Sequence, residues 1–567
     1  MKEERSTSQV LYGFLPQQTV DLRGDVWKVT EWRNALRVQN IDDETLRREL
    51  QRLVLPWETA QNDNYLGRIL RRNEALRVVE VNPENGVEVE PFPKQWVCRV
   101  CKRLHGSADA RCQCGNQALS SFHFVGYHDQ CGALREVPLP QACPQHSQRA
   151  VRFPGASQAS ELRFVCPVCD RTLRKGFPQN ITCPCGKPGK ITFNVHRAAA
   201  VFTPRTVVVV NAPKADQRVA IAAAGGRSRA LSWMLDGMSG KVTEANATEE
   251  SLRQTLRVQG MPDTVIEMMV TQARDAGALG STAPVVLRAE VKDAAEDQAV
   301  TVALASLNSR QSQADLQSLA SGMTARGALY QDRYQPAIAS AGLESVDLFD
   351  RFPILTGVFG YTRGDYAPGA SALVPFKHKA GGVTIHADFA ETEALYFRLD
   401  PVRVANWLVR RGRMLPAFDD ARSARLAILE VCAMPASMDR DESIDQELFM
   451  LVHSYAHRAM RIGAKFAGIE RSALAELLVP LHLGFFVYAS PRGDFVLGGL
   501  QSVFESRLHD YLGAIVNDER RCPMDPGCGK ASGACPACLH VGEPSCRWFN
   551  QLLDRRTLFG GAGYFRT

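Results

Sequence analysis

Two stretches of this chain decide its fold: 98-CRVCKRLHGSADARCQCG-115 and, 68 residues later, 166-CPVCDRTLRKGFPQNITCPCG-186. Each opens with Cys-x-Val-Cys-x-Arg and closes with Cys-x-Cys-Gly. Two close cysteine pairs can bring four thiolates onto one tetrahedral Zn(II), and a glycine permits the tight turn after the second pair. The doubled frame therefore predicts two structural zinc sites, each built from one frame: Cys98, Cys101, Cys112 and Cys114, then Cys166, Cys169, Cys183 and Cys185.

A third set of ligands lies between the two frames, in 128-HDQCGALREVPLPQACPQH-146. His128 and Cys131 form one close pair, and Cys143 and His146 form another after eleven intervening residues. This spacing predicts a third zinc site of two cysteines and two histidines. Stray cysteines beside surface histidines remain the alternative.

The C-terminal string 522-CPMDPGCGKASGACPACLHVGEPSC-546 offers five cysteines for four positions. We expect Cys535 and Cys538 to form one pair and Cys546 to be the third ligand, with either Cys522 or Cys528 as the fourth. Closed sites of four thiolates are typical of structural zinc, so zinc is the favoured ion here. An iron–sulfur cluster, which also takes four thiolates, remains the alternative. Cys432 stands outside both clusters and is expected to be a buried apolar filler.

The charge of the chain is unevenly distributed. The whole sequence of 567 residues carries +6, but residues 94–230 hold 20 Lys and Arg against six acidic residues, a net charge of +14. A basic segment that coincides with small metal folds is an electrostatic footprint for phosphates. The candidate DNA contacts are Arg103, Arg171, Arg174, Lys175, Lys187 and Lys190. A solvated basic surface, or one that faces an acidic protein, is the other interpretation.

Length and pattern predict a multidomain α/β (α+β) protein with several small zinc-ribbon or knuckle modules and a helical insertion. The expected domains are an N-terminal mixed α/β segment (1–95, with a hairpin over 78–92), a basic zinc-binding segment (96–212), the helical insertion (213–345) and a C-terminal α/β domain (346–567) that ends in the cysteines of 522–546. The chain shows neither a signal-peptide pattern nor an apolar run long enough to span a membrane, so we expect a soluble, cytoplasmic protein.

The sequence gives little support for an enzyme. It has no Walker A loop, since 235-LDGMSGKV-242 lacks both the first glycine and the Ser or Thr after lysine. His453 and His457 in 453-HSYAH-457 have the spacing of a zinc protease, but Ser454 stands where the general-base glutamate would be. We therefore expect these histidines to form a polar, hydrogen-bonded helix face.

The C-terminal half carries a family resemblance. The strings HSYAHR, Glu476-Leu477, FFVYASPRGDFVLGGL and CPMDPGC…ACPACLHVGEPSCRWFNQLLDR resemble the MrfA-type cysteine-rich zinc-binding domain found behind DExH helicases. The strings 359-FGYTRG-364 and 391-ETEALYFRLDP-401 are similar to those of DrmB-like proteins, subunits of the DISARM anti-phage systems. The resemblance covers about 350–567 and, more loosely, 96–212.

This resemblance implies a non-catalytic partner of a separate Swi/Snf-type helicase, DrmA. The pair would engage phage DNA, including DNA with free single-stranded ends. The expected function is therefore that of a zinc-bearing accessory subunit of a helicase in antiviral defence. The alternatives are a stand-alone nucleic-acid-binding protein without a motor, a nuclease that uses His453 or His457, and a scaffold that binds an acidic protein.

Overall fold

The structure is a computed structural model, and it describes residues 7–39, 41–60, 64–153, 161–210, 215–244, 249–275, 286–309, 328–365, 367–490, 497–542, 545–546, 548 and 550–565. The chain divides into two compact units. Unit 1 comprises Met1–Val209 and Leu355–Phe389, and unit 2 comprises Val210–Ile354 and Ala390–Thr567. Each unit therefore takes its residues from two separate stretches of sequence.

The N-terminal part of unit 1 begins with a helix and a small sheet. Helix α1 (Thr7–Gly13) precedes a three-stranded antiparallel sheet, ordered β1 (Thr19–Leu22), β2 (Asp25–Trp32) and β5 (Val87–Pro91). The expected hairpin over 78–92 is wrong, because β4 (Leu76–Glu80) pairs with β3 (Leu36–Arg37) and with β18 (Val383–Leu399) rather than with β5. The period-2 pattern identified both strands, but their partners lie far away in the sequence.

A larger sheet contributes strands to both units. Strands β16 (Leu343–Thr362) and β18 (Val383–Leu399) each have residues in both units. In unit 1 they join β15 (Thr203–Val210), β17 (Val374–Pro375), β4 and β3. Helices α2 (Asp43–Ala60) and α3 (Tyr65–Arg71) contribute Leu46, Leu50 and Leu66 to the apolar core that these strands line.

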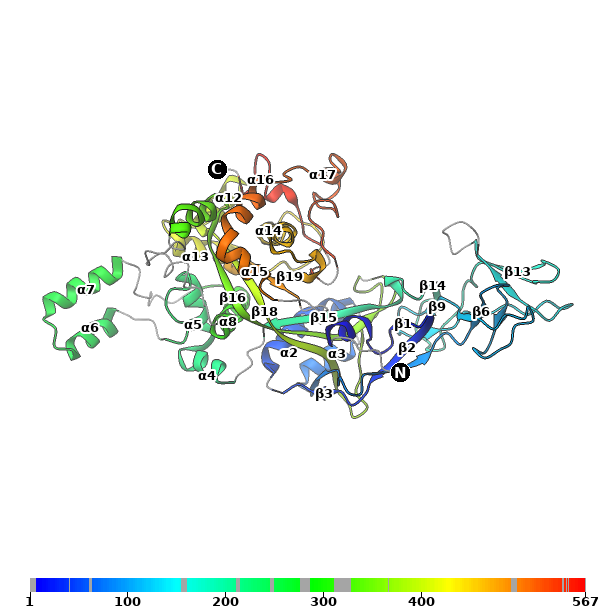
Figure 1. Cartoon of the computed structure of the whole chain (residues 1–567). Helices are drawn as coiled ribbons and strands as arrows, with labels where there is room; N and C mark the ends of the chain where they lie inside the picture. The colour runs from blue at the N-terminus through cyan, green and yellow to red at the C-terminus, as the bar shows by residue number, and fades with distance from the viewer. Residues whose placement is uncertain are drawn as a thin grey trace. The chain divides into compact units, whose positions relative to one another are not determined.

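The cysteine-rich part of unit 1 consists of three separate three-stranded sheets. Their strand orders are β7-β6-β8, β10-β9-β14 and β11-β12-β13. The strands are β6 (Trp96–Cys98), β7 (Leu104–His105), β8 (Leu119–Ser121), β9 (Phe124–Tyr127), β10 (Leu134–Arg135), β11 (Ala150–Arg152), β12 (Arg163–Val165), β13 (Thr172–Lys175) and β14 (Thr192–Val195). Strands of two to four residues bury little apolar surface, so this segment needs additional cross-links to be rigid. Figure 1 shows these short strands in cyan and blue, around the labels β6, β9 and β13.

Unit 2 is built around one long helix, α14 (Ile444–Ala467), which Ser443 caps at its start and Gly468 ends in a left-handed conformation. Eighteen of its residues, from Gln446 to Ala464, are buried. The helix packs against β19 (Leu474–Val479), β20 (Gly484–Ala489) and α16 (Leu508–Asn517). Figure 1 labels α14 beside β19. A helix buried on so many sides can carry polar side chains only where partners meet them.

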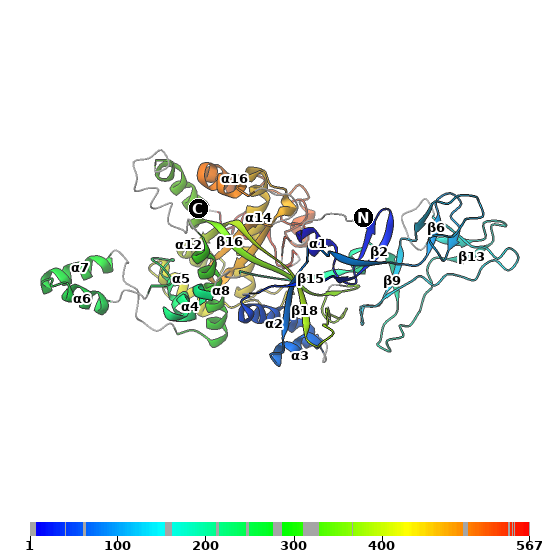
Figure 2. The ribbon, with the colours of Figure 1, turned by 60° about the horizontal axis from the view of Figure 1, so that its bottom comes forward.

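The other elements of unit 2 surround this core or lie beyond it. They include α11 (Gln335–Ser340), α12 (Pro401–Arg410), α13 (Ala421–Val431), α15 (Gly499–Ser502) and α17 (Gly527–Ala531). The described residues of the predicted helical insertion (213–345) form α4 (Ala215–Ala223), α5 (Gly226–Leu235), α6 (Glu249–Val258), α7 (Asp263–Asp275) and α8 (Ala289–Asn308), together with α11 and the first residues of β16. Helices α6 and α7 lie side by side in both views (Figures 1 and 2). In the part of the chain with described structure, no helix is long and apolar enough to cross a membrane.

The mixed α/β fold with small cysteine-bearing modules is the predicted fold class. The predicted filler Cys432 is fully buried in the core of unit 2.

Candidate metal centres

Six short turns in the cysteine-rich part of unit 1 share one geometry. In each turn, the residue directly after the second Cys or His has a positive φ, and its N–H donates to the carbonyl oxygen of the first ligand residue, over 2.7–3.3 Å. The residues with positive φ are Lys102, Gly115, Gly132, Ser147, Asp170 and Gly186. This turn points both ligand side chains to the same side, so each pair supplies half of a four-ligand site.

The first frame forms one group, as predicted. The ligand atoms of Cys98, Cys101, Cys112 and Cys114 lie within 4.8 Å of one another. The Cys98 and Cys114 sulfurs are 3.6 Å apart, and those of Cys101 and Cys112 are 3.3 Å apart. Burial raises the pKa of the Cys98 thiol, but N–H groups that include those of Cys101 and Val100 donate to its sulfur and bring the pKa down to about 6. The turn therefore favours the thiolate, which is the metal-binding form.

The second frame does not form a site by itself, and the predicted pairing is wrong. Two mixed groups replace the expected all-cysteine site and the expected site of two cysteines and two histidines. One joins His128 and Cys131 to Cys183 and Cys185, and the other joins Cys143 and His146 to Cys166 and Cys169. All eight predicted side chains belong to these groups. The two inner pairs, at 143–146 and 166–169, form one group, and the two outer pairs, at 128–131 and 183–185, form the other.

Strand pairing explains this nested arrangement. Strand β11 pairs with β12, and this brings the turn before β11, with Cys143, to Cys166 at the end of β12. Strand β9 pairs with β14, which brings His128, directly after β9, to the loop before β14 that holds Cys185. Each turn fixes only its own two ligands, so the strand pairing selects the partner turn.

The two histidines present Nδ1 to the sulfurs. Nδ1 of His128 lies 3.1 Å from the Cys131 sulfur and 3.5 Å from that of Cys185. Its Nε2 donates to the carbonyl oxygen of Pro188 at 3.1 Å, which leaves the Nδ1 lone pair free for a metal. Nδ1 of His146 lies 3.6 Å from the Cys143 sulfur and 3.5 Å from that of Cys166.

The donor atoms fit a tetrahedral ion. Metal–sulfur bonds of about 2.3 Å and metal–nitrogen bonds of about 2.0–2.1 Å place neighbouring ligand atoms about 3.3–3.8 Å apart. The nine closest sulfur–sulfur and sulfur–nitrogen contacts in these three groups run from 3.1 to 3.9 Å, and all ligand atoms of a group lie within 4.8 Å of one another. These groups could therefore hold metal ions.

The C-terminal cysteines form a fourth group with a different membership from the one expected. Both Cys522 and Cys528 join Cys535 and Cys538, with sulfur–sulfur distances of 3.5–3.7 Å. Cys546, the predicted third ligand, is not in this group. Its sulfur lies 3.3 Å from Nε2 of His453 on α14.

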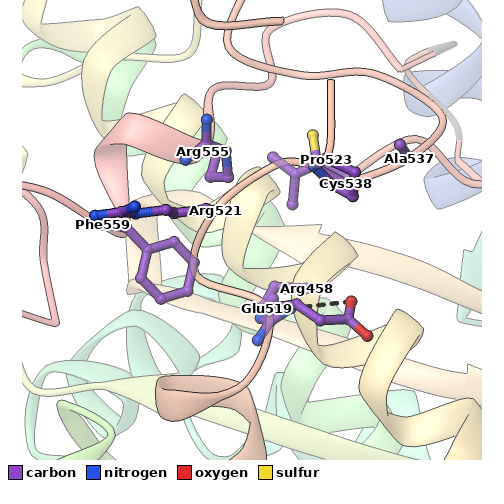
Figure 3. A pocket seen from close by; sticks show the side chains of 9 residues that line it. Arg458, Glu519, Arg521, Pro523, Ala537, Cys538, Arg555 and Phe559 are labelled. Carbon is purple, nitrogen blue, oxygen red and sulfur yellow. Dashed lines mark ion pairs between the residues drawn. The ribbon is translucent and has the colours of Figure 1, made fainter. Parts of the chain in front are cut away.

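The surroundings of this fourth group are cationic. The guanidinium of Arg461 donates to the carbonyl oxygens of Pro536 and Ala537, within the Cys535–Cys538 turn. Figure 3 shows a small pocket beside Cys538, where Arg458 pairs with Glu519 at 3.9 Å and Arg521 and Arg555 also line the wall. Cys538 already belongs to a complete four-ligand group, so the pocket offers no open coordination position.

The histidines of α14 are hydrogen bonded, as predicted. Nδ1 of His453 donates to the carbonyl oxygen of Leu552 at 3.3 Å, and Nδ1 of His457 donates to that of Leu539 at 2.8 Å. Sequence reasoning missed that their Nε2 atoms also converge on Glu476 of β19, at 3.1 and 3.4 Å. The only sequence signal was the four-residue spacing of the histidines, which places them on one face of a helix.

The candidate DNA contacts fall into two classes. Arg171, Lys175, Lys187 and Lys190 are exposed. Arg174 is half-buried, lies over the Phe164 ring at 4.5 Å and donates to the carbonyl oxygen of Pro138. Arg103 is also half-buried and donates to Gln148. These last two arginines therefore have structural contacts of their own.

Comparison with known families gives one match. A family model described as a domain of unknown function (DUF8724) matches residues 6–210. The match includes the three candidate metal-binding groups of unit 1 and ends at the last residue of β15. No curated protein matches the chain.

Proposed function

We propose that this protein is a non-catalytic, zinc-binding accessory subunit that works with a DrmA-like, Swi/Snf-type helicase on phage DNA in the cytoplasm. Its cysteine-rich segment would contact the sugar–phosphate backbone, and the partner would supply the motor. The resemblance to DrmB-like proteins and the net charge of residues 94–230 support this function.

A row of cations across one small sheet carries the proposal. Arg152 of β11 lies directly opposite Arg163 of β12, and Arg163 lies directly opposite Lys175 of β13. All three residues are exposed. Like charges directly opposite each other destabilise a sheet, and neighbouring strands are only about 4.8 Å apart. Such a row suits a polyanion whose phosphates neutralise it.

An exposed aromatic side chain follows β11. Phe153 comes directly after Arg152, is 51 % exposed and stacks on Phe124 of β9 with 6.3 Å between ring centroids. Exposed aromatic rings bind unpaired bases by stacking, whatever the base sequence. This favours single-stranded DNA, or DNA with single-stranded ends, over a closed duplex.

The metal groups support a structural use of the ions. Each of the four groups described above provides four protein ligands and leaves no position for a water or a substrate. Cys and His ligands in tetrahedral sets are typical of Zn(II), which is the ion that we propose for them. Closed sites of this kind stabilise a small fold and do not catalyse reactions.

The test measures binding of a labelled single-stranded DNA as a function of salt concentration. The triple variant Arg152→Gln, Arg163→Gln, Lys175→Gln is expected to lower the slope of log K against log salt by about 2, at about 0.7 per lost phosphate contact. The matched control changes three exposed arginines outside the cysteine-rich segment: Arg37, Arg410 and Arg471.

An unchanged slope in the triple variant would refute the contact surface. Purification of the tagged protein from its native host tests the partner. A large helicase that co-purifies in a fixed ratio supports the accessory subunit. Bound nucleic acid without a motor would instead identify a stand-alone nucleic-acid-binding protein.

A further inference from the structure

Four side chains from three separate parts of unit 2 meet in its interior. His453 and His457 come from α14, Glu476 comes from β19, and Cys546 comes from the C-terminal segment. Their candidate ligand atoms lie within 4.8 Å of one another. The two histidines and the glutamate are 0 % exposed and the cysteine is 4 % exposed. Ionisable groups rarely gather at such depth unless something neutralises them.

The hydrogen bonds of the histidines fix which nitrogen faces the others. A carbonyl oxygen can only accept, so the contacts of both Nδ1 atoms with the carbonyls of Leu552 and Leu539 place a proton on each Nδ1. A neutral imidazole then has its lone pair on Nε2, which points at Glu476 and Cys546. A carbonyl that holds the outer nitrogen is the usual support for a metal-binding histidine.

The atoms at the centre are mostly acceptors. Oε1 of Glu476 lies 3.1 Å from Nε2 of His453 and 3.4 Å from Nε2 of His457. Among the described residues, neither Oε2 of Glu476 nor Nε2 of His457 has a hydrogen-bond partner. A fully buried carboxylate oxygen and a fully buried ring nitrogen without partners are costly. A cation among them would satisfy both.

Cys546 is held as a metal ligand would be. The backbone N–H groups of Trp548 and Asn550 donate to its sulfur at 3.3 and 3.4 Å, and such bonds favour a thiolate, whereas burial and the neighbouring Glu476 raise the pKa of this thiol well above its usual value. A bound cation would offset both of these opposing effects. One thiolate and one carboxylate carry two negative charges, which a divalent cation neutralises. The filled site would therefore be electrically neutral, as an interior site with no exposed ligand requires.

We propose that His453, His457, Glu476 and Cys546 bind a divalent transition-metal ion, with Zn(II) as the ion that this mixed nitrogen, oxygen and sulfur set suits best. Three of the separations, at 3.1–3.4 Å, are close to the 3.3–3.8 Å of a tetrahedral ion, and all four ligand atoms lie within 4.8 Å of one another. The site is separate from the Cys522–Cys538 group. Its role is structural, since it ties the C-terminal segment to α14 and β19.

The first test compares the metal content of full-length variants by mass spectrometry of the elements. His457→Gln is expected to lower the content by one ion per chain, and Glu476→Gln is expected to weaken retention against a chelator. His482→Gln is the matched control, because His482 is also buried in unit 2 and hydrogen bonded to a carbonyl, but lies outside the group. The comparison uses differences, so it does not depend on how many other sites are filled.

The second test protects the inference against simple misfolding. His457→Cys keeps four ligands and adds a thiolate, so we expect full metal content and, after substitution with Co(II), a stronger sulfur-to-metal charge-transfer band. Equal metal content in the wild type and in His457→Gln, with identical Co(II) spectra, would overturn the proposal. In that case Glu476 would form a buried ion pair with a protonated histidine, and no metal would be bound.

Discussion

The cation row of β11, β12 and β13 predicts that one substitution will stabilise the free protein and weaken DNA binding. Arg163 stands between Arg152 and Lys175, so Arg163→Gln removes two cross-strand pairs of like charge. Each such pair is worth about 0.2–1 kcal/mol. Asp170 forms an ion pair with Arg152 and partly neutralises it. Most of the repulsion that the substitution removes is therefore between Arg163 and Lys175. We expect a local stabilisation of about 0.5–1 kcal/mol at low salt.

Hydrogen exchange of the backbone amides measures this effect where it occurs. The stabilisation corresponds to exchange that is slower by roughly two- to five-fold in β11, β12 and β13, without DNA. The difference should vanish near 1 M salt, where the screening length falls to about 3 Å, below the strand spacing. Arg163→Lys is the control, because it keeps the charge and should change little. Faster exchange in Arg163→Gln than in the wild type, or slower exchange that persists at 1 M salt, would refute the reasoning.

Three further predictions concern metal pairing, acid and backbone strain. Cys166→Ser should release one ion and expose Cys143 to alkylating reagents while Cys183 stays protected, as peptide mass spectrometry would show; equal labelling of both would contradict the nested pairing. Burial lowers the pKa of His386 to about 3, so the unfolded chain takes up a proton that the fold excludes. The free energy of unfolding of unit 1 should therefore fall by about 2 kcal/mol between pH 7 and pH 5 and should continue to fall until about pH 3. The melting temperature of His386→Leu should decrease less over the same pH range. Lys102→Gly should stabilise the first metal group by about 1 kcal/mol, since lysine has a φ of 59° there, and more chelator should be needed to remove the ion. A melting profile of His386→Leu as acid-sensitive as that of the wild type, or easier metal loss in Lys102→Gly, would count against these two.

The sequence predicts the metal-binding turns well because each is local. A Cys-x2-Cys turn needs only a left-handed residue after its second ligand, and the Cys-x-Cys-Gly string supplies one directly. The pairing of turns is not local. Cys166 looks equally suited to Cys183 and to Cys143, and only the register of β11 on β12 decides between them.

The buried group in unit 2 was harder to predict for the same reason. Cys546 follows Cys538 closely in sequence, and proximity suggested a shared site. The strand that carries Glu476 holds the C-terminal segment instead, through the hydrogen bond from the Glu476 N–H to the carbonyl oxygen of Ser545.

The sequence also could not separate the exposed cations from the packed ones at Arg174 and Lys175, because strand alternation sends neighbouring side chains to opposite faces. One packs on Phe164 and the other stays exposed.

The nested pairing in unit 1 also favours an order of assembly, if the groups bind metal. The inner turns, at 143–146 and 166–169, close a short loop, whereas the outer turns at 128–131 and 183–185 must meet across the whole inner module. Once the inner ion is bound, the outer turns are joined by a compact spacer rather than by a flexible chain, and closing the outer site costs less entropy. The wrong partner turns also offer Cys and His ligands that a metal ion accepts, so an ion captured before β11 meets β12 would stabilise a misfolded chain. Slow metal supply during synthesis would then favour the correct fold, and a sudden excess of metal would favour trapped ones.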